Sequence, residues 1–391
     1  MDRRAFLHAT VSAAAFGVAG IGSASVAFAA APAGANYRKL LVLIELKGGN
    51  DGLNTVVPFT DPAYYALRPK LAVARDAVLP ISDRAGMHPA LAPLLPLWKD
   101  RQLAVLQGVG YPAPNLSHFR SIEIWDTASP SEVYLQDGWL TRAFAAAPVP
   151  RTFAADGVLI GSNDLGPLNG SGTRAVALAN TDQFLRRAKL ATPQGEAHNK
   201  AFQHVLKVES DIVQAAMHLD ARREFSTDFP QGGFGNAIRT ACQVIANPAG
   251  VAVVRVTLSG FDTHGGQSAT HARLLGELAQ GLVALKSGLD ELGRWNETLI
   301  LTYAEFGRRP RENLSGGTDH GTANVHFALG GRVAGSFYGE PPSLDRLGGD
   351  GNPGYALDFR GLFATVLEQW WGVPSQAALG GKFAPVPFVK A

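Results

Sequence analysis

Cysteine is almost absent from this chain: Cys242 is the only one in 391 residues. An intrachain disulfide is therefore impossible, and a zinc site built from several cysteines is excluded. Charged residues make up only 17% of the chain and the net charge is +2, so the composition does not suggest a nucleic-acid-binding surface. Any metal ion must be held by oxygen atoms and imidazole nitrogens.

The first thirty residues have the pattern of an export signal. Arg3 and Arg4 precede a weakly apolar stretch rich in alanine and glycine, and the sequence AFA at residues 27–29 is a small-x-small cleavage site. Paired arginines before such a stretch are typical of bacterial twin-arginine signals. Glycines interrupt the stretch and no second span follows. We therefore expect a signal peptide over residues 1–30 and a periplasmic or secreted protein with no membrane span after processing.

Strand and helix signals alternate along the rest of the chain, which indicates an α/β fold. Near-continuous apolar runs predict strands that are buried on both faces. The runs are KLLVLIEL at 39–46, QLAVLQGVG at 102–110, GVLIG at 157–161, VAVVRVTLSG from 251 and TLILTYAEFG from 298, and NVHFALGG from 324 predicts a last short strand. We therefore predict a mostly parallel sheet flanked by helices.

Three helical features complete this prediction. A helix-like stretch from about Ser268 to Leu292 joins the strands that begin at 251 and 298, so these two strands are expected to be parallel neighbours. Residues from about 181 to 246 predict a helical insertion. DFRGLFATVLEQWWG predicts an amphipathic closing helix that ends at Gly372. Together these elements predict a single α/β domain over residues 36–391.

Polar residues follow the predicted strands at their carboxyl ends, where open α/β sheets bind ligands. The candidates are Asp51 after the first strand, Ser117, His118 and Arg120 after the second, Asp262 and His264 after the strand from 251, Glu305 after the strand from 298, and Asp319 and His320 before the last strand. Each has an ordinary structural explanation, since aspartate is common in turns and serine at helix N-caps. Because so many candidates are expected at one edge of one sheet, we predict a ligand-binding site there.

The carboxylates and histidines in this set predict a metal site. Asp262 and His264 are two residues apart, so in an extended chain their side chains point the same way. Clustered carboxylates repel one another unless a cation is present. Imidazole with carboxylate favours zinc or manganese, whereas a carboxylate-rich site would also accept calcium or magnesium. His271 and His326 are interpreted as packing residues, with His271 as a reserve ligand.

Five segments together carry a family resemblance: LKGGNDGLNTVVP, NLSHFRSIEIWD, SGFDTHGG, LTYAEFGRRPREN and GTDHGTANVHFALGGRV. They resemble an uncharacterised family of twin-arginine-exported bacterial proteins within the alkaline phosphatase/sulfatase superfamily. The resemblance covers nearly all of the chain after the signal peptide. It implies an alkaline-phosphatase-like core, one or two divalent ions at the strand ends, and hydrolysis of a small anionic phosphate or sulfate ester.

The resemblance also implies roles for individual residues. Asp51 would match the metal-ligating aspartate after the first strand, and Ser117 would stand where the nucleophile begins a helix. Asp262 and His264 resemble the Asp/His pair of one metal site. His320 resembles the late histidine ligand.

Two departures from the superfamily pattern concern the implied metal sites: one removes an imidazole from the second site, and the other affects the match at His264. Glu305 stands where the superfamily often has Asp-His, and it is followed by Phe306, which removes one imidazole. The Asp-x-His spacing is tighter than the usual Asp-x-x-x-His. His118 would be a substitute for the missing imidazole, and Asp319 a further carboxylate. No Cys- or Ser-x-Pro-x-Arg motif is present, which excludes the formylglycine type of sulfatase.

Ester hydrolysis needs an activated nucleophile and a group that binds the anion. At a helix N-terminus, Ser117 would be activated by metal coordination and by the positive end of the helix dipole. Arg120, one turn further on, would hold the non-bridging oxygens. Alternatively, water attacks at the metal and Ser117 is only a helix cap.

Other functions fit the sequence less well. A Ser-His-Asp hydrolase would need a G-x-S-x-G elbow, and none surrounds the candidate serine. GVGYPA after the second strand matches a loose dinucleotide pattern, but Pro112 and Pro114 would disrupt the helix that must meet the pyrophosphate. A non-catalytic, metal-stabilised scaffold or binding protein of the same fold is the main alternative. Phe306 favours it, and the retained serine and arginine oppose it.

Overall fold

The computed structural model describes residues 34–178 and 223–390. These residues belong to one compact unit that begins at Gly34. The predicted signal peptide lies outside the described residues, and so does the predicted helical insertion up to residue 222. In the described part of that insertion, α8 (Gly233–Ile245) is a helix.

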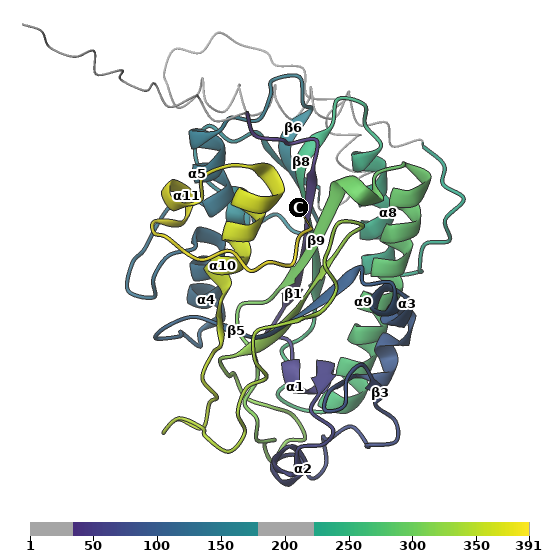
Figure 1. The fold of residues 1–391 in the computed structure, drawn as a ribbon, viewed down its shortest axis with the longest axis vertical. Coiled ribbons are helices and arrows are strands. Elements are labelled where there is room, and N and C mark those ends of the chain that lie inside the picture. Colours follow the sequence, from purple (N-terminus) through teal and green to yellow (C-terminus); the bar gives the residue numbers. More distant parts are fainter. Residues whose placement is uncertain (1–33, 179–222, 391) are drawn as a thin grey trace, which may run out of the picture. The chain divides into compact units, whose positions relative to one another are not determined.

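A mixed, mostly parallel sheet forms the centre of the described structure (Figure 1). Its strands lie in the order β11-β5-β10-β9-β1-β8-β6-β7, and β12 also pairs with β5. They are β1 (Leu40–Lys47), β5 (Leu103–Gly110), β6 (Ala155–Ile160), β7 (Ala175–Leu178), β8 (Val251–Ser259), β9 (Thr298–Tyr303), β10 (Asn324–Leu329), β11 (Phe337–Tyr338) and β12 (Leu357–Asp358). Within this sheet only β10 runs antiparallel to its described neighbours. The predicted mostly parallel α/β architecture is therefore confirmed.

The prediction that the strands beginning at residues 251 and 298 are neighbours is wrong. β8 and β9 are parallel, but β1 lies between them and pairs with both. The helix that joins them, α9 (Gln267–Glu291), fixes their common direction but not their adjacency. β1 can take the middle position because it is apolar on both faces. Val42 and Ile44 belong to one hydrophobic core, and Leu41 and Leu43 belong to the other.

Helices cover both faces of the sheet (Figure 1). One face carries α8, α9, η1 (Pro89–Leu94) and α3 (Leu95–Lys99), and the other carries α4 (His118–Thr127), α5 (Trp139–Ala146), α10 (Phe359–Ala364) and α11 (Gln376–Leu379). Each layer has its own hydrophobic core. Because side chains alternate along a strand, the central strands supply residues to both cores.

Short elements complete the described fold. α1 (Gly52–Thr55) follows β1 directly, and α2 (Pro62–Leu67) comes next in the chain. A small second sheet has the order β2-β4-β3, with β2 (Val56–Val57), β3 (Leu79–Pro80) and β4 (Gly86–Met87), and two 3-10 turns are η2 (Gly166–Leu168) and η3 (Trp295–Glu297). Among the described helices, none combines the length and the apolar character that a membrane span requires.

The predicted closing helix is present, with a change in its hydrogen bonding. α10 continues into a π-helical segment, Thr365–Trp371, which ends at Gly372 with φ 75°. Trp370 and Trp371 are buried, and their indole N–H groups donate to backbone carbonyls at the start of β1. These bonds fasten the C-terminal helical segment to the central strand.

A buried ion pair joins the two central strands β1 and β8. Glu45 accepts hydrogen bonds from the Arg255 guanidinium at 2.8 Å and from the Thr257 hydroxyl at 2.7 Å. Both charged side chains are at most 2% exposed. Removal of one member of such a pair leaves the other charge buried without compensation.

Replacing Glu45 by alanine should therefore lower the free energy of unfolding by about 3–5 kcal/mol. Chemical denaturation followed by tryptophan fluorescence measures this loss. The matched control is Glu277→Ala, which removes the exposed pair between Arg273 and Glu277 on α9 and should cost less than about 0.5 kcal/mol. Equal losses in the two variants would contradict the importance assigned to the buried pair.

Candidate metal centre

Several chain segments meet at the carboxyl edge of the sheet: the turn after β1, the start of α4, the loop after β8 and residues 304–320 after β9. Glycine permits the closest approaches between them. A Cβ atom on Gly48, whose φ is 115°, would lie 2.4 Å from the Asp262 nitrogen. A Cβ atom on Gly317 would lie 2.3 Å from the His264 carbonyl carbon. Neither position has room for a side chain, so these glycines let the polar loops pack together.

Arg308 connects these loops. Its side chain is fully buried, and its Nη2 atom donates to Asp262 Oδ1 at 2.7 Å. The guanidinium also donates to the backbone carbonyls of Gly48, Gly49, Phe261 and Thr318. One side chain therefore ties the turn after β1, the loop after β8 and the loop before β10 to a single point.

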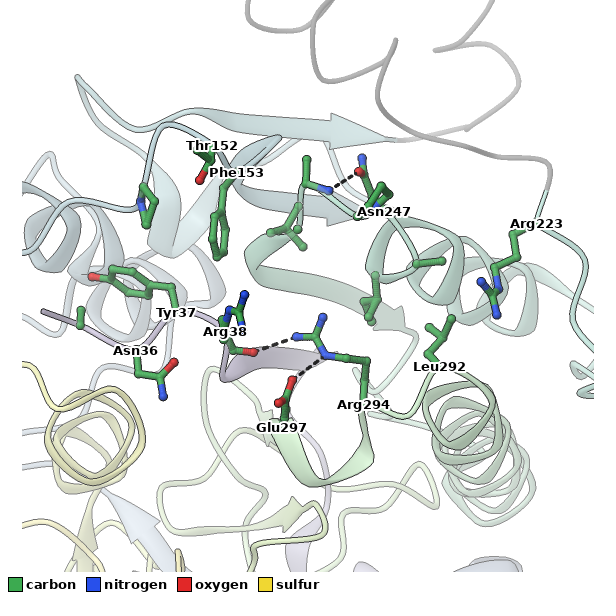
Figure 2. Close-up of a pocket in the computed structure, with 18 of the residues that line it drawn as sticks. Asn36, Tyr37, Arg38, Thr152, Phe153, Arg223, Asn247, Leu292, Arg294 and Glu297 are labelled. Carbon is green, nitrogen blue, oxygen red and sulfur yellow. Dashed lines mark hydrogen bonds and ion pairs between the residues drawn. The ribbon is translucent and has the colours of Figure 1, made fainter.

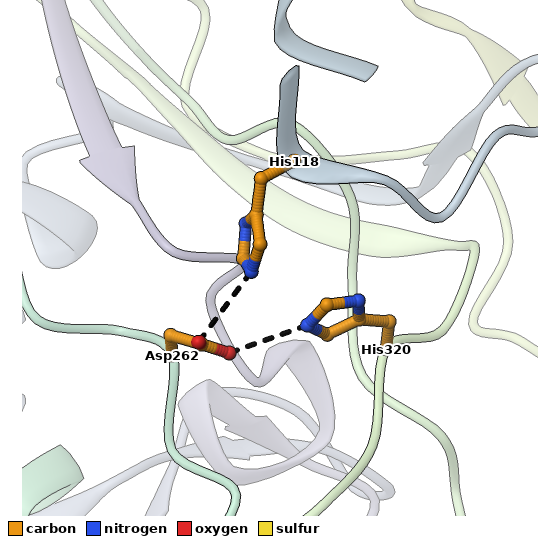
Figure 3. A group of neighbouring side chains, drawn as sticks. All are labelled: His118, Asp262 and His320. Atoms are coloured by element: carbon orange, nitrogen blue, oxygen red, sulfur yellow. Dashed lines mark hydrogen bonds and ion pairs between the residues drawn. The ribbon is translucent and has the colours of Figure 1, made fainter. Parts of the chain in front are cut away.

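His118, Asp262 and His320 form a compact group whose candidate ligand atoms all lie within 4.8 Å of one another (Figure 3). His118 is the first residue of α4, Asp262 lies in the loop after β8, and His320 lies in the loop before β10. His118 Nε2 is 3.5 Å from Asp262 Oδ2, and His320 Nε2 is 3.3 Å from Asp262 Oδ1. The structure thus brings together three predicted site residues from distant parts of the sequence.

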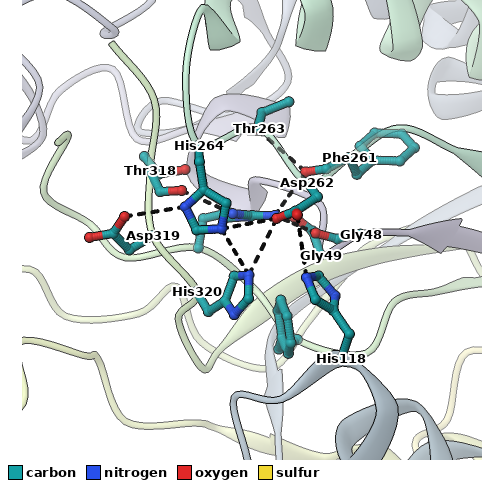
Figure 4. Close-up of polar contacts among 12 residues, drawn as sticks. Gly48, Gly49, His118, Phe261, Asp262, Thr263, His264, Thr318, Asp319 and His320 are labelled. Atoms are coloured by element: carbon teal, nitrogen blue, oxygen red, sulfur yellow. Dashed lines mark hydrogen bonds and ion pairs between the residues drawn. The ribbon is translucent and has the colours of Figure 1, made fainter. Parts of the chain in front are cut away.

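His264 joins this group from the same loop as Asp262 (Figure 4). Its Nε2 atom lies 3.1 Å from Asp262 Oδ1 and 3.0 Å from Nε2 of His320. We call these four residues, His118, Asp262, His264 and His320, the histidine–aspartate cluster. Their side chains are between 21% and 47% exposed, so a solute can reach them.

Each imidazole of the cluster is held through its other ring nitrogen. Nδ1 of His118 lies 2.9 Å from Glu305 Oε1, Nδ1 of His320 lies 2.8 Å from the Leu116 carbonyl, and Nδ1 of His264 lies 3.3 Å from Asp319 Oδ1. All three partners can accept a hydrogen bond from Nδ1–H, and a neutral imidazole in this tautomer presents the lone pair of its Nε2 to the cluster. A carboxylate or carbonyl in this position is typical of metal-ligating histidines. Glu305 and Asp319, which were predicted as ligands, are therefore hydrogen-bond partners of Nδ1 of His118 and His264 in the structure.

The charges in the cluster favour a cation. Burial raises the pKa of Asp262, but the hydrogen bond and charge of Arg308 outweigh it and lower this pKa to about 2. The hydrogen bond to Glu305 raises the pKa of His118, whereas burial lowers the pKa of His320. An ionised carboxylate therefore faces a neutral imidazole that presents a lone pair. A cation between these two acceptors would satisfy both, so the residues fit a divalent metal ion.

The structure places Asp51 outside the cluster. Asp51 is 1% exposed, accepts the Asn54 N–H at 3.3 Å as the N-cap of α1, and forms an ion pair with Arg68 at 2.6 Å. Arg68 also donates to Asn54 Oδ1 and to the carbonyls of Arg309 and Pro310. A buried guanidinium thus stands beside Asp51, where a cation bound by this carboxylate would have to lie.

The two residues predicted to act on an ester lie in different settings. Ser117 is the exposed N-cap residue of α4, and its side chain makes no capping hydrogen bond. Arg120 is 7% exposed, and its guanidinium lies 3.8 Å from the centre of the Tyr134 ring. It donates to the carbonyls of Pro130, Ser131 and Val133. Ser117 is therefore next to the cluster, whereas the guanidinium of Arg120 is bound by the loop at 130–134.

The sequence matches one known protein family over most of its length. A family described as "Protein of unknown function (DUF1501)" matches residues 98–371, which include the whole histidine–aspartate cluster. The chain belongs to this family. No curated protein matches the sequence.

Solved structures with a similar arrangement include two bacterial proteins. The chain is similar to the C-terminal periplasmic domain of EcEptC from Escherichia coli in complex with Zn, with a TM-score of 0.39, 10% identity and coverage of 75% of this chain and 72% of that chain. It is similar to the lipoteichoic acid synthase LtaP from Listeria monocytogenes, with a TM-score of 0.36, 11% identity and coverage of 90% and 75%.

Two arginines of this DUF1501 member that pair with the candidate aspartates, Arg308 with Asp262 and Arg68 with Asp51, were not predicted to be buried. Arg308 lies in a GRRP segment after β9, and Arg68 in a stretch with no motif. Arginine is usually exposed, so residue type alone predicts the surface for both. The sequence feature that could have indicated buried arginines was the presence of Asp51 and Asp262 after apolar strands, since a buried carboxylate needs a positively charged partner. His271, interpreted as a packing residue, is buried next to Asn50, and burial lowers its pKa to about 4.

A cavity of about 960 Å³ opens at the opposite edge of the sheet, at the amino ends of β1 and β8 (Figure 2). Tyr37 and Phe153 line it, and Arg294 there pairs with Glu297 and donates to the Arg38 carbonyl. Its described lining contains no histidine and none of the predicted site residues. The candidate site is therefore the carboxyl edge, where parallel strands direct their ligands.

Glu305→Gln should lower the pKa of His118 in the metal-free protein, because the hydrogen bond and charge of Glu305 raise it. NMR titration of the imidazole resonances measures the change. Protonation of His118 therefore stabilises the fold at a pH below the ordinary histidine pKa, and this stabilisation is lost as the pH rises through the raised pKa of His118. His320 is the internal control, with a pKa that stays low. An unchanged His118 pKa would contradict the orienting role of Glu305.

Proposed function

We propose that this chain is an exported, metal-dependent hydrolase of a phosphate or sulfate ester, with the metal held by the histidine–aspartate cluster. One observation carries the proposal: three imidazoles held through Nδ1 surround one ionised carboxylate at the carboxyl edge of the sheet. The resemblance of the five sequence segments supports the class of reaction. The paired arginines at residues 3 and 4 support export.

The donor set favours a single zinc or manganese ion. Three imidazoles and a carboxylate suit these metals, whereas calcium and magnesium prefer oxygen ligands. One ion is proposed because Arg68 already neutralises Asp51. In addition, Phe306 packs its ring against His118 and His320, with centroid separations of 4.9 and 4.4 Å, and so occupies space beside the cluster that another imidazole would use.

Ser117 is the proposed nucleophile. A divalent ion in the site would polarise the ester and lower the pKa of a nearby hydroxyl or water. Ser117 offers such a hydroxyl, because it is exposed and adjoins His118 at the amino end of α4. The first backbone N–H groups of a helix have no partner within the helix, and with the helix dipole they favour an anion there. These groups would hold the non-bridging oxygens that Arg120 was expected to hold.

A non-catalytic, metal-stabilised scaffold is the second candidate function. The observation that favours it is the position of Arg120, whose guanidinium serves the carbonyls of the loop at 130–134. The fully buried Arg308 is likewise occupied by carbonyls and by Asp262. A scaffold of this kind would bind metal and gain stability from it, but would turn over no ester.

Metal binding tests the centre. Chelator-treated protein should take up about one equivalent of zinc or manganese, measured by calorimetry and elemental analysis. Glu305→Gln, which weakens the hydrogen bond that holds His118, should weaken binding by about 10–100-fold, and Asp262→Asn should weaken it further. His88→Asn is the control, because His88 lies outside the cluster and asparagine can replace it as the cap of η1. Uptake of two equivalents, or none by a folded chain, would refute the proposed centre.

Hydrolysis tests Ser117. The metal-loaded protein should hydrolyse 4-nitrophenyl phosphate, bis(4-nitrophenyl) phosphate or 4-nitrophenyl sulfate, and Ser117→Ala should lower kcat by orders of magnitude without changing metal content. Ser131→Ala, which alters a partly exposed serine whose hydroxyl donates to the Ala113 carbonyl on a neighbouring loop, is the control. Full turnover by Ser117→Ala would leave water as the nucleophile. No turnover by the metal-loaded wild type would favour the scaffold.

A further inference from the structure

Large apolar side chains that are exposed to solvent gather around the histidine–aspartate cluster. Within residues 34–178 and 223–390 they are Phe119, Val133, Tyr134, Leu314 and Tyr355, which we call the apolar rim. Scattered exposed apolar residues are normal on a protein surface. Here they are confined to segments at the carboxyl edge of the sheet, and such confinement marks an interaction surface.

The two most exposed members of the rim adjoin the cluster directly. Phe119 is 88% exposed and follows His118 in the first turn of α4. Helical side chains tilt toward the helix N-terminus, so Phe119 projects toward the end of α4 that lies at the cluster. Leu314 is fully exposed, and the side chain of its neighbour Asn313 donates to the His264 carbonyl at 3.0 Å. Phe119 and Leu314 therefore adjoin two different imidazoles of the cluster (Figure 4).

The other members of the rim lie beside the same helix end. Val133 and Tyr134 belong to the loop whose carbonyls accept hydrogen bonds from Arg120, so this loop lies next to the first turn of α4. Tyr355 lies at the carboxyl end of β5, since a Cβ atom on Gly110 would be 2.8 Å from its Cβ atom. The rim thus combines four segments that are separate in the sequence.

These four segments carry almost no charge. Residues 112–119, 130–134, 313–316 and 353–356 include a single aspartate, glutamate, lysine or arginine, which is Glu132. Attraction to an anionic membrane or to a nucleic acid requires clustered lysine and arginine. The rim therefore matches a surface that is itself neutral, such as a layer of zwitterionic lipid.

A lipid layer fits the rim better than a protein partner does. A stable protein interface buries about 800 Å² on each partner, and its core is depleted of charged groups. The centre of this surface is the cluster, whose ionisable side chains are 21% to 47% exposed. At a membrane surface, phenylalanine and leucine enter the acyl region while the headgroup layer stays polar and hydrated. A polar centre within an apolar rim suits this layered surface.

We propose that the apolar rim docks this protein on the surface of a lipid bilayer, so that the histidine–aspartate cluster faces the headgroups. Phe119 and Leu314 enter the acyl region, and Tyr134 and Tyr355 lie at the headgroup level, where tyrosine is enriched. Docking of this kind requires no hydrolysis. Together with the proposed function, on which this last step rests, it makes the substrate an amphiphile whose ester lies at the bilayer surface.

Paired substitutions in two segments test the rim. Leu314→Ser removes the apolar side chain, and Leu314→Ile, the matched control, retains it. Phe119→Ser and Phe119→Leu form the second pair. Both positions are highly exposed, so thermal melting should show similar stability for all four variants. Elemental analysis should show the same metal content in each, because neither residue belongs to the cluster.

Cosedimentation of the metal-loaded protein with phosphatidylcholine vesicles measures docking. The wild type, Leu314→Ile and Phe119→Leu should bind at low and at high salt, because the contact is apolar. Each serine variant should bind about tenfold more weakly. No binding by the wild type, equal binding by Leu314→Ser and Leu314→Ile, or binding only to vesicles that contain phosphatidylserine would overturn the proposal.

Light scattering separates docking on lipid from association between copies of the chain. Self-association that Leu314→Ser abolishes, with no binding to vesicles, would overturn the proposal and assign the rim to a second copy. Vesicle binding without ester hydrolysis supports docking and counts only against the proposed function. Hydrolysis of soluble esters without vesicle binding supports that function and refutes docking.

Discussion

The organisation of the carboxyl edge depends on the buried guanidinium of Arg308. Loops that end parallel strands carry backbone carbonyls that a sheet cannot pair, and burial of these carbonyls without donors would be costly. The Arg308 guanidinium donates hydrogen bonds to four of these loop carbonyls. It also forms an ion pair with Asp262. Because one rigid, planar cation serves all these acceptors, the loops can stay packed and the carboxylate of Asp262 stays ionised.

The buried arginines also place the two candidate aspartates, Asp51 and Asp262, in different electrostatic settings. Asp51 is neutralised within the protein by Arg68, whereas Asp262 has Arg308 on one side and imidazole lone pairs on the other. The first arrangement is complete without a ligand. The second leaves acceptors facing one another in a solvent-accessible position. This difference explains why only the cluster around Asp262 is suited to an exchangeable cation, although both aspartates follow buried strands.

The sequence predicted the sheet, and its candidate list included all four residues of the cluster, whereas the strand order and the buried arginines were not predicted. Apolar runs revealed the strands, and the meeting of strand ends brought His118, Asp262 and the later histidines together. The prediction that β8 and β9 are neighbours was wrong because the helix that joins them does not determine whether another strand lies between them. Arg120 had the spacing to face Ser117, but helical spacing does not reveal that the loop at 130–134 supplies better-placed acceptors.

The cluster draws on segments that are far apart in the chain, in a protein whose single cysteine rules out an internal covalent bridge. An ion seated on those segments would close long chain loops in the way that a disulfide does, by restricting the unfolded ensemble relative to the folded one. It would differ in being reversible. The free energy of unfolding would then rise with the concentration of free ion by mass action, and depletion of that ion would lower it.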